Sequence, residues 1–232
     1  MRFAVILSGG TGSRVGGAIP KQYVRVGSKT VLGYCLETAA GCTDRVCIVA
    51  SEKWRELIEN EAAGLGIKDI IFAAPGETRQ LSVYNGLRAL EKAATNDDGV
   101  IICDAARPLA SRELFDSCFK ALSEGHDGAM PVLPMKDTVY FSDDGRKLTG
   151  LTDRKKLFAG QAPEAFLYGK YREANDRLLP DQILKINGSS EPAYLAGMDI
   201  ALIPGDERNF KITTVQDLEE FKKIAGRNGE KI

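Results

Sequence analysis

The stretch FAVILSGGTGSR at residues 3–14 decides the fold that the rest of the chain must fit. The five apolar residues at its start have the length and apolar density of a strand that is buried on both faces of a sheet. This strand runs directly into a glycine-rich loop, whose backbone N–H groups can approach and surround a phosphate. The stretch therefore predicts an anion-binding turn at the carboxyl end of a first strand.

The same alternation of apolar runs and helical patterns continues through the first 130 residues. Further buried strands are predicted at residues 46–50, 70–72, 100–103 and 129–133, and helices at residues 52–66, at residues 79–90 and after Ser111. This order predicts an α/β fold with a doubly wound, mostly parallel sheet and helices on both faces. Ligands of such sheets bind beyond the carboxyl ends of the strands.

The pattern changes after Pro134. Residues 136–157 read as two short strands around a turn at 143–145, which predicts a protruding β-hairpin arm. Because a lone hairpin is marginally stable in water, we expect it to contact the body or another subunit. Beyond it we predict an extended return at 158–162, a helix near 167–178, a strand at 199–203 and a last helix that Thr214 and Asp217 cap. We expect a single domain over residues 1–232.

Composition excludes several classes of function. The 31 Lys and Arg residues balance 32 Asp and Glu residues, so the chain lacks the basic excess that is typical of nucleic-acid binding. The first apolar run is too short for a signal sequence or a membrane span, so we expect a cytoplasmic protein without a membrane partner. The five cysteines contain no C-x-x-C pair, and we interpret them as reduced core residues.

The glycine loop alone is a weak signal. It departs from the dinucleotide fingerprint because Val15 stands where a small residue is needed, and the chain has no P-loop lysine motif. The nearby cations Arg14 and Lys21 strengthen the phosphate-binding interpretation over that of a simple turn. A dinucleotide-dependent oxidoreductase is disfavoured because no acidic residue follows such a fingerprint at the ribose-binding spacing.

Polar or small residues also follow the third and fourth predicted strands. They are PGETRQLSV at residues 75–83 and DAARP at residues 104–108. Asp104 comes directly after a buried apolar run, where a carboxylate is costly unless a cation or a metal meets it. A structural Asp–Arg pair and a Mg²⁺ site are therefore both open interpretations.

Six motifs together resemble one family, the cytidylyltransferases of 2-C-methyl-D-erythritol 4-phosphate and their relatives that act on D-ribitol 5-phosphate. The motifs are LSGGTGSR at residues 7–14 with PKQ at 20–22, GETRQLSV at 76–83, DAARP at 104–108, DT at 137–138, QAP at 161–163 and NFKIT at 209–213. The resemblance runs from residue 3 to about 222. It implies a Rossmann-like nucleotidyltransferase that uses Mg²⁺ to transfer CMP from CTP to a small polyol phosphate and releases pyrophosphate.

The resemblance also implies roles for individual residues. The triphosphate would be held by Gly9, Gly10, Gly12, Arg14 and Lys21. The cytosine and ribose pocket would be lined by Ser8, Gly76, Arg79, Ser82 and Ala105. Asp104 would lie near the metal, and Lys211 would reach the α-phosphate. The hairpin would form a homodimer arm and would present Asp137, Thr138 and Arg154 to the acceptor.

This residue set suits attack by a phosphate. The acceptor phosphate is already largely dianionic at pH 7, so no side chain has to deprotonate it. Arg14, Lys21, Lys211 and Mg²⁺ would instead stabilise the charge that builds up on the departing pyrophosphate. His126, the single histidine, is predicted to be an exposed loop residue.

The chain departs from the family pattern on the acceptor side. Ala162 replaces a threonine, and Asn187 and Gly188 replace a Thr-Asp pair. Asn187, Ser189 or Ser190 could supply substitute polar contacts. Three hypotheses therefore stay open: transfer to methylerythritol phosphate, transfer to ribitol 5-phosphate or another small phosphate or phosphonate, and a non-catalytic protein that binds CTP.

Overall fold

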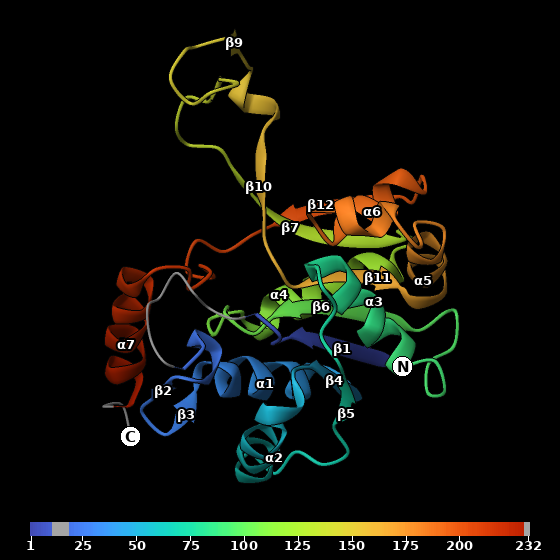
Figure 1. Cartoon of the computed structure of the whole chain (residues 1–232), viewed down its shortest axis with the longest axis vertical. Coiled ribbons are helices and arrows are strands. Elements are labelled where there is room, and N and C mark those ends of the chain that lie inside the picture. The colour runs from blue at the N-terminus through green and yellow to red at the C-terminus, as the bar shows by residue number, and fades with distance from the viewer. Residues whose placement is uncertain (11–18, 230–232) are drawn as a thin grey trace.

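One eight-stranded sheet forms the centre of the computed structural model, which describes residues 1–10 and 19–229 (Figure 1). The main path is β10-β7-β11-β6-β1-β4-β5, and β12 also pairs with β7. Only β10 and β11 run antiparallel to their neighbours in this sheet. The strands are β1 (Arg2–Leu7), β4 (Arg45–Val49), β5 (Ile71–Ala73), β6 (Gly99–Asp104), β7 (Gly128–Pro134), β10 (Phe158–Gly160), β11 (Glu164–Leu167) and β12 (Ile200–Pro204).

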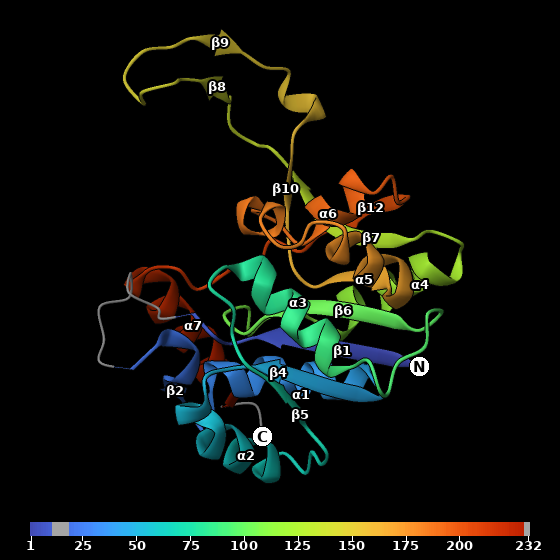
Figure 2. The same cartoon turned by 45° about the vertical axis from the view of Figure 1, so that its right-hand side comes forward.

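Helices cover both faces of the sheet (Figure 2). Helices α1 (Val31–Cys42), α2 (Arg55–Gly64) and α4 (Arg112–Ser123) enclose the core on one face. Helices α3 (Arg79–Ala89), α5 (Tyr168–Asp176) and α6 (Ser190–Leu195) enclose the core on the other face. Helix α7 (Val215–Gly229) packs through Leu218 and Phe221 near the start of α1. The predicted doubly wound, mostly parallel α/β fold is confirmed.

Local sequence explains where several helices begin. The hydroxyl of Thr30 accepts a hydrogen bond from the Gly33 N–H at 2.9 Å, and Ser111 caps α4 in the same manner. The Asp217 carboxylate accepts hydrogen bonds from the N–H groups of Thr213 and Thr214, and the Thr214 hydroxyl accepts from the Asp217 N–H. The predicted capped start of the last helix is therefore confirmed.

The structure differs from the sequence prediction at several elements. Strand β5 is only half-buried because it forms the edge of the sheet, so the expectation of burial on both faces is wrong there. Strand β11, helices α1 and α6, and the small hairpin of β2 (Arg25–Val26) and β3 (Lys29–Thr30) were not predicted. Helix α1 is apolar on most of its surface and lacks the clean stripe that marks an amphipathic helix.

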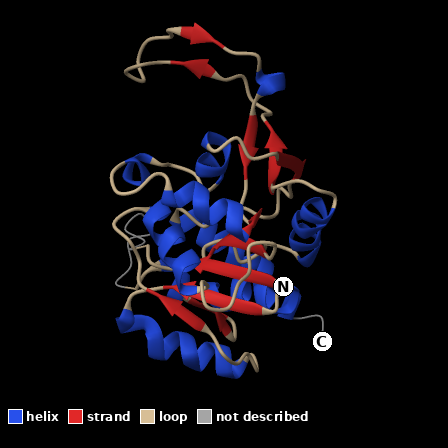
Figure 3. Ribbon diagram, turned by 90° about the vertical axis from the view of Figure 1, so that its right-hand side faces the viewer, coloured by secondary structure: helices blue, strands red, loops and turns tan. Residues whose placement is uncertain are grey.

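The predicted hairpin arm projects away from the sheet (Figure 3). Its strands β8 (Tyr140–Phe141) and β9 (Gly150–Leu151) pair antiparallel. Gly145 has φ +70°, a left-handed conformation that glycine adopts without steric cost. The side chains of the arm, Leu151 at 75% exposure among them, are left largely in solvent.

Two smaller predictions can also be compared with the structure. All five cysteines are buried and unpaired, as expected. His126 lies in the loop between α4 and β7, with its side chain 40% exposed and Nδ1 2.7 Å from Asp199 Oδ2. Among the helices that the structure describes, none combines the length and apolar character needed to cross a membrane.

Candidate active site

A cavity of about 520 Å³ opens at the carboxyl ends of β1 and β6. This is the edge at which a doubly wound sheet is expected to bind a ligand. Five further lining residues belong to the quoted motifs but had no predicted role: Leu7, Gln22, Glu77, Thr78 and Ala106. The cavity brings together nine predicted site residues: Gly9, Gly10, Lys21, Gly76, Arg79, Ser82, Asp104, Ala105 and Lys211.

The described part of the glycine loop is held by Gln22. Its Nε2 donates hydrogen bonds to the carbonyls of Ser8, at 2.8 Å, and Gly10, at 2.6 Å. Gln22 belongs to the short 3₁₀ helix Lys21–Tyr23, so the same turn brings Lys21 to the cavity. Gly9 is required here because a Cβ would lie 2.5 Å from Pro75 Cβ. The PKQ motif therefore fixes the loop as well as supplying a cation.

Three predicted residues of this region need separate mention. The buried Ser8 hydroxyl lies 3.0 Å from the Tyr23 hydroxyl, and its role at the pocket stays a prediction. Gly12 and Arg14 lie outside the described residues.

The loop before α3 forms the opposite wall. The Gly76 N–H donates to Ser82 Oγ at 3.0 Å, and that hydroxyl donates to the Thr78 carbonyl at 3.0 Å. Thr78 also caps α3 through the Leu81 N–H. The N-terminus of α3, where the helix dipole favours negative charge, therefore faces the cavity together with Arg79.

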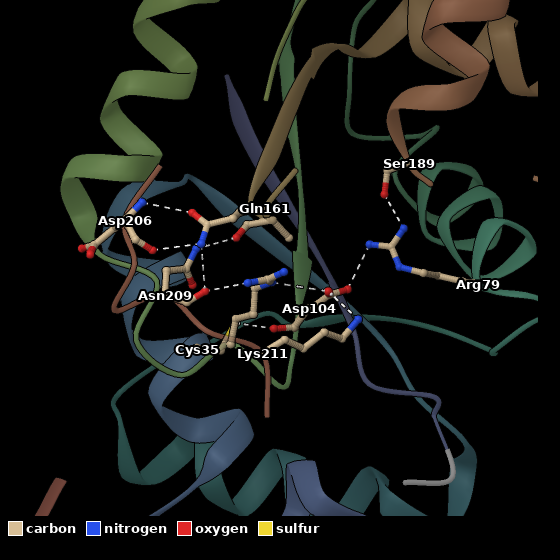
Figure 4. A network of polar contacts seen from close by, with 10 residues as sticks. Cys35, Arg79, Asp104, Gln161, Ser189, Asp206, Asn209 and Lys211 are labelled. Carbon is tan, nitrogen blue, oxygen red and sulfur yellow. Dashed lines mark hydrogen bonds and ion pairs between the residues drawn. The ribbon is translucent and has the colours of Figure 1, made fainter. Parts of the chain in front are cut away.

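Asp104 is the electrostatic centre of the site (Figure 4). Its Oδ1 lies 2.9 Å from Arg79 Nη2, and its Oδ2 lies 2.8 Å from Lys211 Nζ and 3.7 Å from Arg107 Nε. Burial alone would raise the pKa of Asp104, but Arg79 and Lys211 outweigh burial and hold that pKa well below 3.8. The carboxylate is therefore ionised at neutral pH and positions two cavity cations.

The loop that carries Lys211 is fixed by the QAP motif (Figure 4). Gln161 donates to the Asp206 carbonyl at 2.9 Å and accepts from the Asp206 N–H at 3.0 Å. Asn209 Nδ2 donates to the Ala162 carbonyl at 2.8 Å. Ala162 is buried and contributes its carbonyl to this anchor, which explains how a residue without a side-chain hydroxyl still supports the site.

Glu164 is a polar residue of this region that the sequence analysis did not select. It begins β11, is 7% exposed, and has Arg79, Asp104 and Arg107 as charged neighbours. Burial raises the pKa of Glu164 to about 7, while both arginines act to lower it. An acidic residue at the start of a short apolar strand was the signal that could have revealed it.

The predicted acceptor residues do not reach this cavity. Asp137, Thr138 and Arg154 lie exposed on the arm, where Arg154 Nη1 donates to the Lys136 carbonyl at 2.7 Å. Asn187 is exposed, and its N–H donates to Glu191 Oε2 at 2.8 Å. Within this single chain, the structure assembles the predicted nucleotide side and leaves the acceptor residues apart from it.

Asp104 also decides whether the site suits Mg²⁺. No group of three or more His, Cys, Asp or Glu side chains that could hold a metal ion occurs among residues 1–10 and 19–229. Mg²⁺ is commonly held by one or two carboxylates together with substrate phosphates, and each carboxylate oxygen has a second lone pair. The donor set therefore fits Mg²⁺ when a triphosphate supplies the remaining oxygens.

A second groove, of about 630 Å³, lies between α2 and the β2–β3 hairpin. It mixes Arg25, Lys29 and Lys53 with Glu56 and Glu61, and most of these side chains have partners within the groove or beside it. None of the predicted site residues lines it. The smaller cavity around Asp104 is therefore the candidate active site.

Comparison with known proteins agrees with this geometry. The family model described as 2-C-methyl-D-erythritol 4-phosphate cytidylyltransferase matches residues 3–226. An enzyme of that name from Rubrobacter xylanophilus is 35% identical over 223 residues, covering 93% of this chain and 90% of the relative. A ribitol-5-phosphate cytidylyltransferase from Streptococcus agalactiae is 28% identical over 97% of this chain and 95% of its own.

Solved structures show the same relationship. The 4-diphosphocytidyl-2C-methyl-D-erythritol synthase of Anaerococcus prevotii superposes with a TM-score of 0.80 at 25% identity, over 96% of this chain and 95% of the other. The 2-C-methyl-D-erythritol 4-phosphate cytidylyltransferase of Thermus thermophilus gives a TM-score of 0.72 at 26% identity, over 97% and 99%. A match that spans nearly the whole chain and agrees with its cavity shows that this protein belongs to the 2-C-methyl-D-erythritol 4-phosphate cytidylyltransferase family of CTP-dependent nucleotidyltransferases.

Proposed function

We propose that this enzyme transfers CMP from CTP to 2-C-methyl-D-erythritol 4-phosphate and releases pyrophosphate. The observation that carries the proposal is the convergence of Lys21, Arg79 and Lys211 on one cavity around Asp104. The 35% identity to the Rubrobacter xylanophilus enzyme over nearly the full chain supports this acceptor. The product would serve isoprenoid precursor synthesis, as the family name implies.

The proposed chemistry is an in-line displacement at the α-phosphorus of CTP. A phosphate oxygen of the acceptor forms the new P–O bond, and the bond from the α-phosphorus to the bridging oxygen of the β-phosphate breaks. The electron pair of that bond leaves on pyrophosphate. Because the acceptor phosphate is largely dianionic at pH 7, this chain needs cations rather than a general base.

We assign the catalytic roles to Arg14, Lys21 and Lys211. Lys21 and Lys211 line the cavity, so they support a role in offsetting charge on the triphosphate and the departing pyrophosphate. Asp104 would hold Mg²⁺ together with triphosphate oxygens, and the bound ion would supply further charge neutralisation. Asp104 also keeps Lys211 in place through their 2.8 Å ion pair.

We assign the nucleotide contacts to the walls of the same cavity. Gly9, Gly10 and Gly12 would meet the triphosphate, and Gly76, Arg79, Ser82 and Ala105 would surround the cytosine and ribose. The buried hydroxyl of Ser8 supports an indirect role, because it anchors Tyr23 beneath the glycine loop. The N-terminus of α3 adds a favourable dipole toward a bound anion.

D-Ribitol 5-phosphate is a second candidate acceptor. The relative from Streptococcus agalactiae covers 97% of the chain, which supports this alternative alongside the methylerythritol compound. Ala162, Asn187 and Gly188 change the polar groups expected around the acceptor, and missing hydrogen-bond partners alter discrimination between polyols.

We propose that the enzyme acts as a homodimer through its arm and works in the cytoplasm. The arm exposes Tyr140, Phe141, Leu148 and Leu151, which supports burial against a second copy. In such a dimer, Asp137, Thr138 and Arg154 would reach the acceptor at the partner's cavity. Five reduced, buried cysteines support the cytoplasmic assignment.

The test is pyrophosphate release from CTP and Mg²⁺ with one acceptor at a time. We expect release with 2-C-methyl-D-erythritol 4-phosphate at ordinary enzymatic efficiency. Release with D-ribitol 5-phosphate alone, or with another small phosphate or phosphonate alone, would reassign the acceptor. CTP binding without release for every acceptor would overturn transfer and favour a non-catalytic CTP-binding protein.

A further inference from the structure

Tyr23 is a buried aromatic residue that the proposed chemistry leaves without a role. Its side chain is 3% exposed, and it ends the 3₁₀ helix Lys21–Tyr23, whose first residue lines the cavity around Asp104. The Tyr23 N–H closes this turn by donating to the Pro20 carbonyl at 2.9 Å. Lys21 and Tyr23 are therefore the two ends of one short turn, and a contact that fixes the Tyr23 ring also fixes the backbone of Lys21.

The Tyr23 hydroxyl is hydrogen-bonded in both directions to Ser8, the residue that joins β1 to the glycine loop. It donates to the Ser8 carbonyl at 3.0 Å and accepts from the Ser8 hydroxyl at 3.0 Å. Gln22 Nε2 donates to the same carbonyl at 2.8 Å, and the Ser8 N–H donates to the Val49 carbonyl at 2.9 Å. Every polar group of Ser8 thus has a partner, and the glycine loop starts from a fixed point.

Trp54 stacks on the Tyr23 ring. The two ring centroids are 4.3 Å apart, and the ring planes differ by 24°. Trp54 ends the 3₁₀ helix Glu52–Trp54, which follows β4, and it packs against the core cluster that contains Tyr23. Stacking fixes the plane of the Tyr23 ring, whereas the hydrogen bonds to Ser8 fix the position of its hydroxyl. The two sets of contacts together define the orientation of Tyr23.

We propose that Tyr23 is a positioning residue that fixes the start of the glycine loop relative to Lys21, and that Trp54 keeps the Tyr23 ring in place. The proposal rests on the proposed binding of the CTP triphosphate by the glycine loop and Lys21. Neither Tyr23 nor Trp54 lines the cavity around Asp104, so both act through Ser8 and the turn rather than on the nucleotide.

Fixing the loop in advance should raise CTP affinity, because glycines lose more conformational freedom than other residues when they become ordered. Gly9 and Gly10 both line the cavity, and a loop that already starts in the binding position avoids part of that cost when a ligand binds. A Tyr23 that only filled the core would instead affect folding stability and leave CTP affinity unchanged. The split between CTP affinity and stability therefore distinguishes positioning from simple packing.

The first experiment removes the Tyr23 hydroxyl and keeps the ring. We expect Tyr23→Phe to bind CTP about 5- to 10-fold more weakly in calorimetry with Mg²⁺, the size of one or two hydrogen bonds. In pyrophosphate release, the KM for CTP should rise by a similar factor. The KM for the acceptor and the kcat at saturating CTP should stay within about 2-fold of the wild-type values, because the change affects CTP binding.

Tyr168→Phe is the matched control. Tyr168 is 2% exposed, and its hydroxyl donates to the Leu87 carbonyl at 3.0 Å, so this change removes a buried hydrogen bond of the same kind and length. Tyr168 does not line the cavity. Both variants should lose a similar amount of stability in urea unfolding, and only Tyr23→Phe should lose CTP affinity.

The second experiment tests the support from Trp54. Trp54→Leu removes the stacked ring, and we expect CTP binding to weaken by about 3- to 5-fold. Trp54→Phe keeps a ring against Tyr23 and should hold the affinity within about 2-fold of wild type. Phe72→Leu removes another half-buried ring that packs on the same core cluster and should leave CTP affinity unchanged. In a Tyr23→Phe background, Trp54→Leu should have a smaller effect, because the hydroxyl through which the ring acts is absent.

The outcomes are distinct. Wild-type CTP affinity in Tyr23→Phe, or an equal loss of affinity in Tyr168→Phe, would overturn the positioning role while leaving the proposed function intact. Wild-type affinity in Trp54→Leu would overturn the support from Trp54. A wild-type enzyme that binds no CTP would overturn the proposed function, and the positioning role with it. Circular dichroism establishes that each variant is folded before its affinity is interpreted.

Discussion

The nucleotide cavity and the hairpin arm use polar residues in opposite ways. In the cavity, Asp104, Arg79 and Lys211 are joined by ion pairs of 2.8 and 2.9 Å and are anchored to neighbouring loops. On the arm, Arg154 and Asp137 are exposed, and no ion pair ties either to the described body. One chain thus brings together residues that were predicted to bind the nucleotide, whereas the residues that were predicted to bind the acceptor lie apart from that cavity.

The strongest way to break the cavity is to remove Lys211. We expect Lys211→Ala to lower kcat by about 10²- to 10³-fold with a modest change in CTP affinity, because the lost charge stabilises the transition state. Steady-state pyrophosphate release measures this. Lys222→Ala, an exposed lysine on α7 paired with Glu219, is the matched control and should retain full activity. Full activity in Lys211→Ala would show that the proposed catalytic role is wrong.

Removing the central carboxylate tests whether the cavity is a charge-balanced unit. Asp104→Asn leaves buried cations without their counter-ion, and we expect a loss of about 3–5 kcal/mol in the free energy of unfolding at pH 7. The pKa of Asp104 is lowered in the folded state, so its contribution is present above pH 3.8 and is lost as the pH falls below that value. The variant should lack this acid-dependent part of stability in urea titrations. A variant as stable as wild type at pH 7 would contradict the charge-balance interpretation.

Glu164, the buried acid beside the cavity, should affect the pH dependence of stability in the direction opposite to that of Asp104. Folding raises the pKa of Glu164 from 4.5 to about 7, so wild-type stability falls as the pH rises between those values and is level above them. Relative to wild type, Glu164→Gln should therefore gain about 3 kcal/mol in the free energy of unfolding between pH 4.5 and pH 8. Urea unfolding of both proteins across that range measures the gain. Parallel stability curves would show that Glu164 does not titrate on folding.

The arm can be tested by its assembly. Leu151→Asp places a charge at the most exposed part of the predicted dimer surface, and we expect it to convert a dimer to monomers without lowering the melting temperature of the fold. Sedimentation velocity at micromolar concentration distinguishes the two species. Lys147→Asp changes the charge at another exposed position in the arm and controls for charge alone. A wild-type protein that sediments as a monomer would contradict the dimer proposal directly.

The smallest expected effect is at the acceptor. Arg154→Ala should raise the KM for the acceptor by about 10-fold, the size of one charge-assisted hydrogen bond, and should leave the KM for CTP unchanged. Lys156→Ala, two residues away and also exposed, is the control. Equal changes in the KM for the acceptor and the KM for CTP would mean that the arm also contributes to CTP binding. The proposed division of roles between the cavity and the arm would then be wrong.

The features that sequence predicted well are those that depend on local pattern. The run at residues 3–7, the glycines after it and the polar residues after the third and fourth strands predicted one edge of the sheet. The structure brings seven of the predicted site residues from these segments to one cavity, together with Lys21 and Lys211. The carboxyl ends of the parallel strands lie at the same edge of the sheet, so residues that follow different strands can be predicted to lie close together even when they are far apart in sequence. Helix α1, which is apolar on most of its surface, gave no such periodic signal.

The features that sequence did not predict depend on contacts between distant segments. Ser189 meets Arg79 across 110 positions of the chain, and nothing near either residue indicates the other. The contact between the hydroxyls of Ser8 and Tyr23, 15 positions apart, was likewise not predicted. Glu164 was not selected from the sequence because a single acidic residue next to a proline is typical of a loop. Only the tertiary fold shows that the Glu164 side chain is buried.

The ion-paired centre described above also bears on how the molecule folds. Its members come from the start of α3, the end of β6, the turn before α6 and the loop before α7, so no fragment of the chain holds the complete set. Contacts this distant in sequence form late, after the sheet has paired its central strands. A nascent chain would therefore gain affinity for CTP only when nearly all of it has folded. CTP added during refolding should leave the rates of the early folding steps unchanged and should stabilise the native state once it has formed.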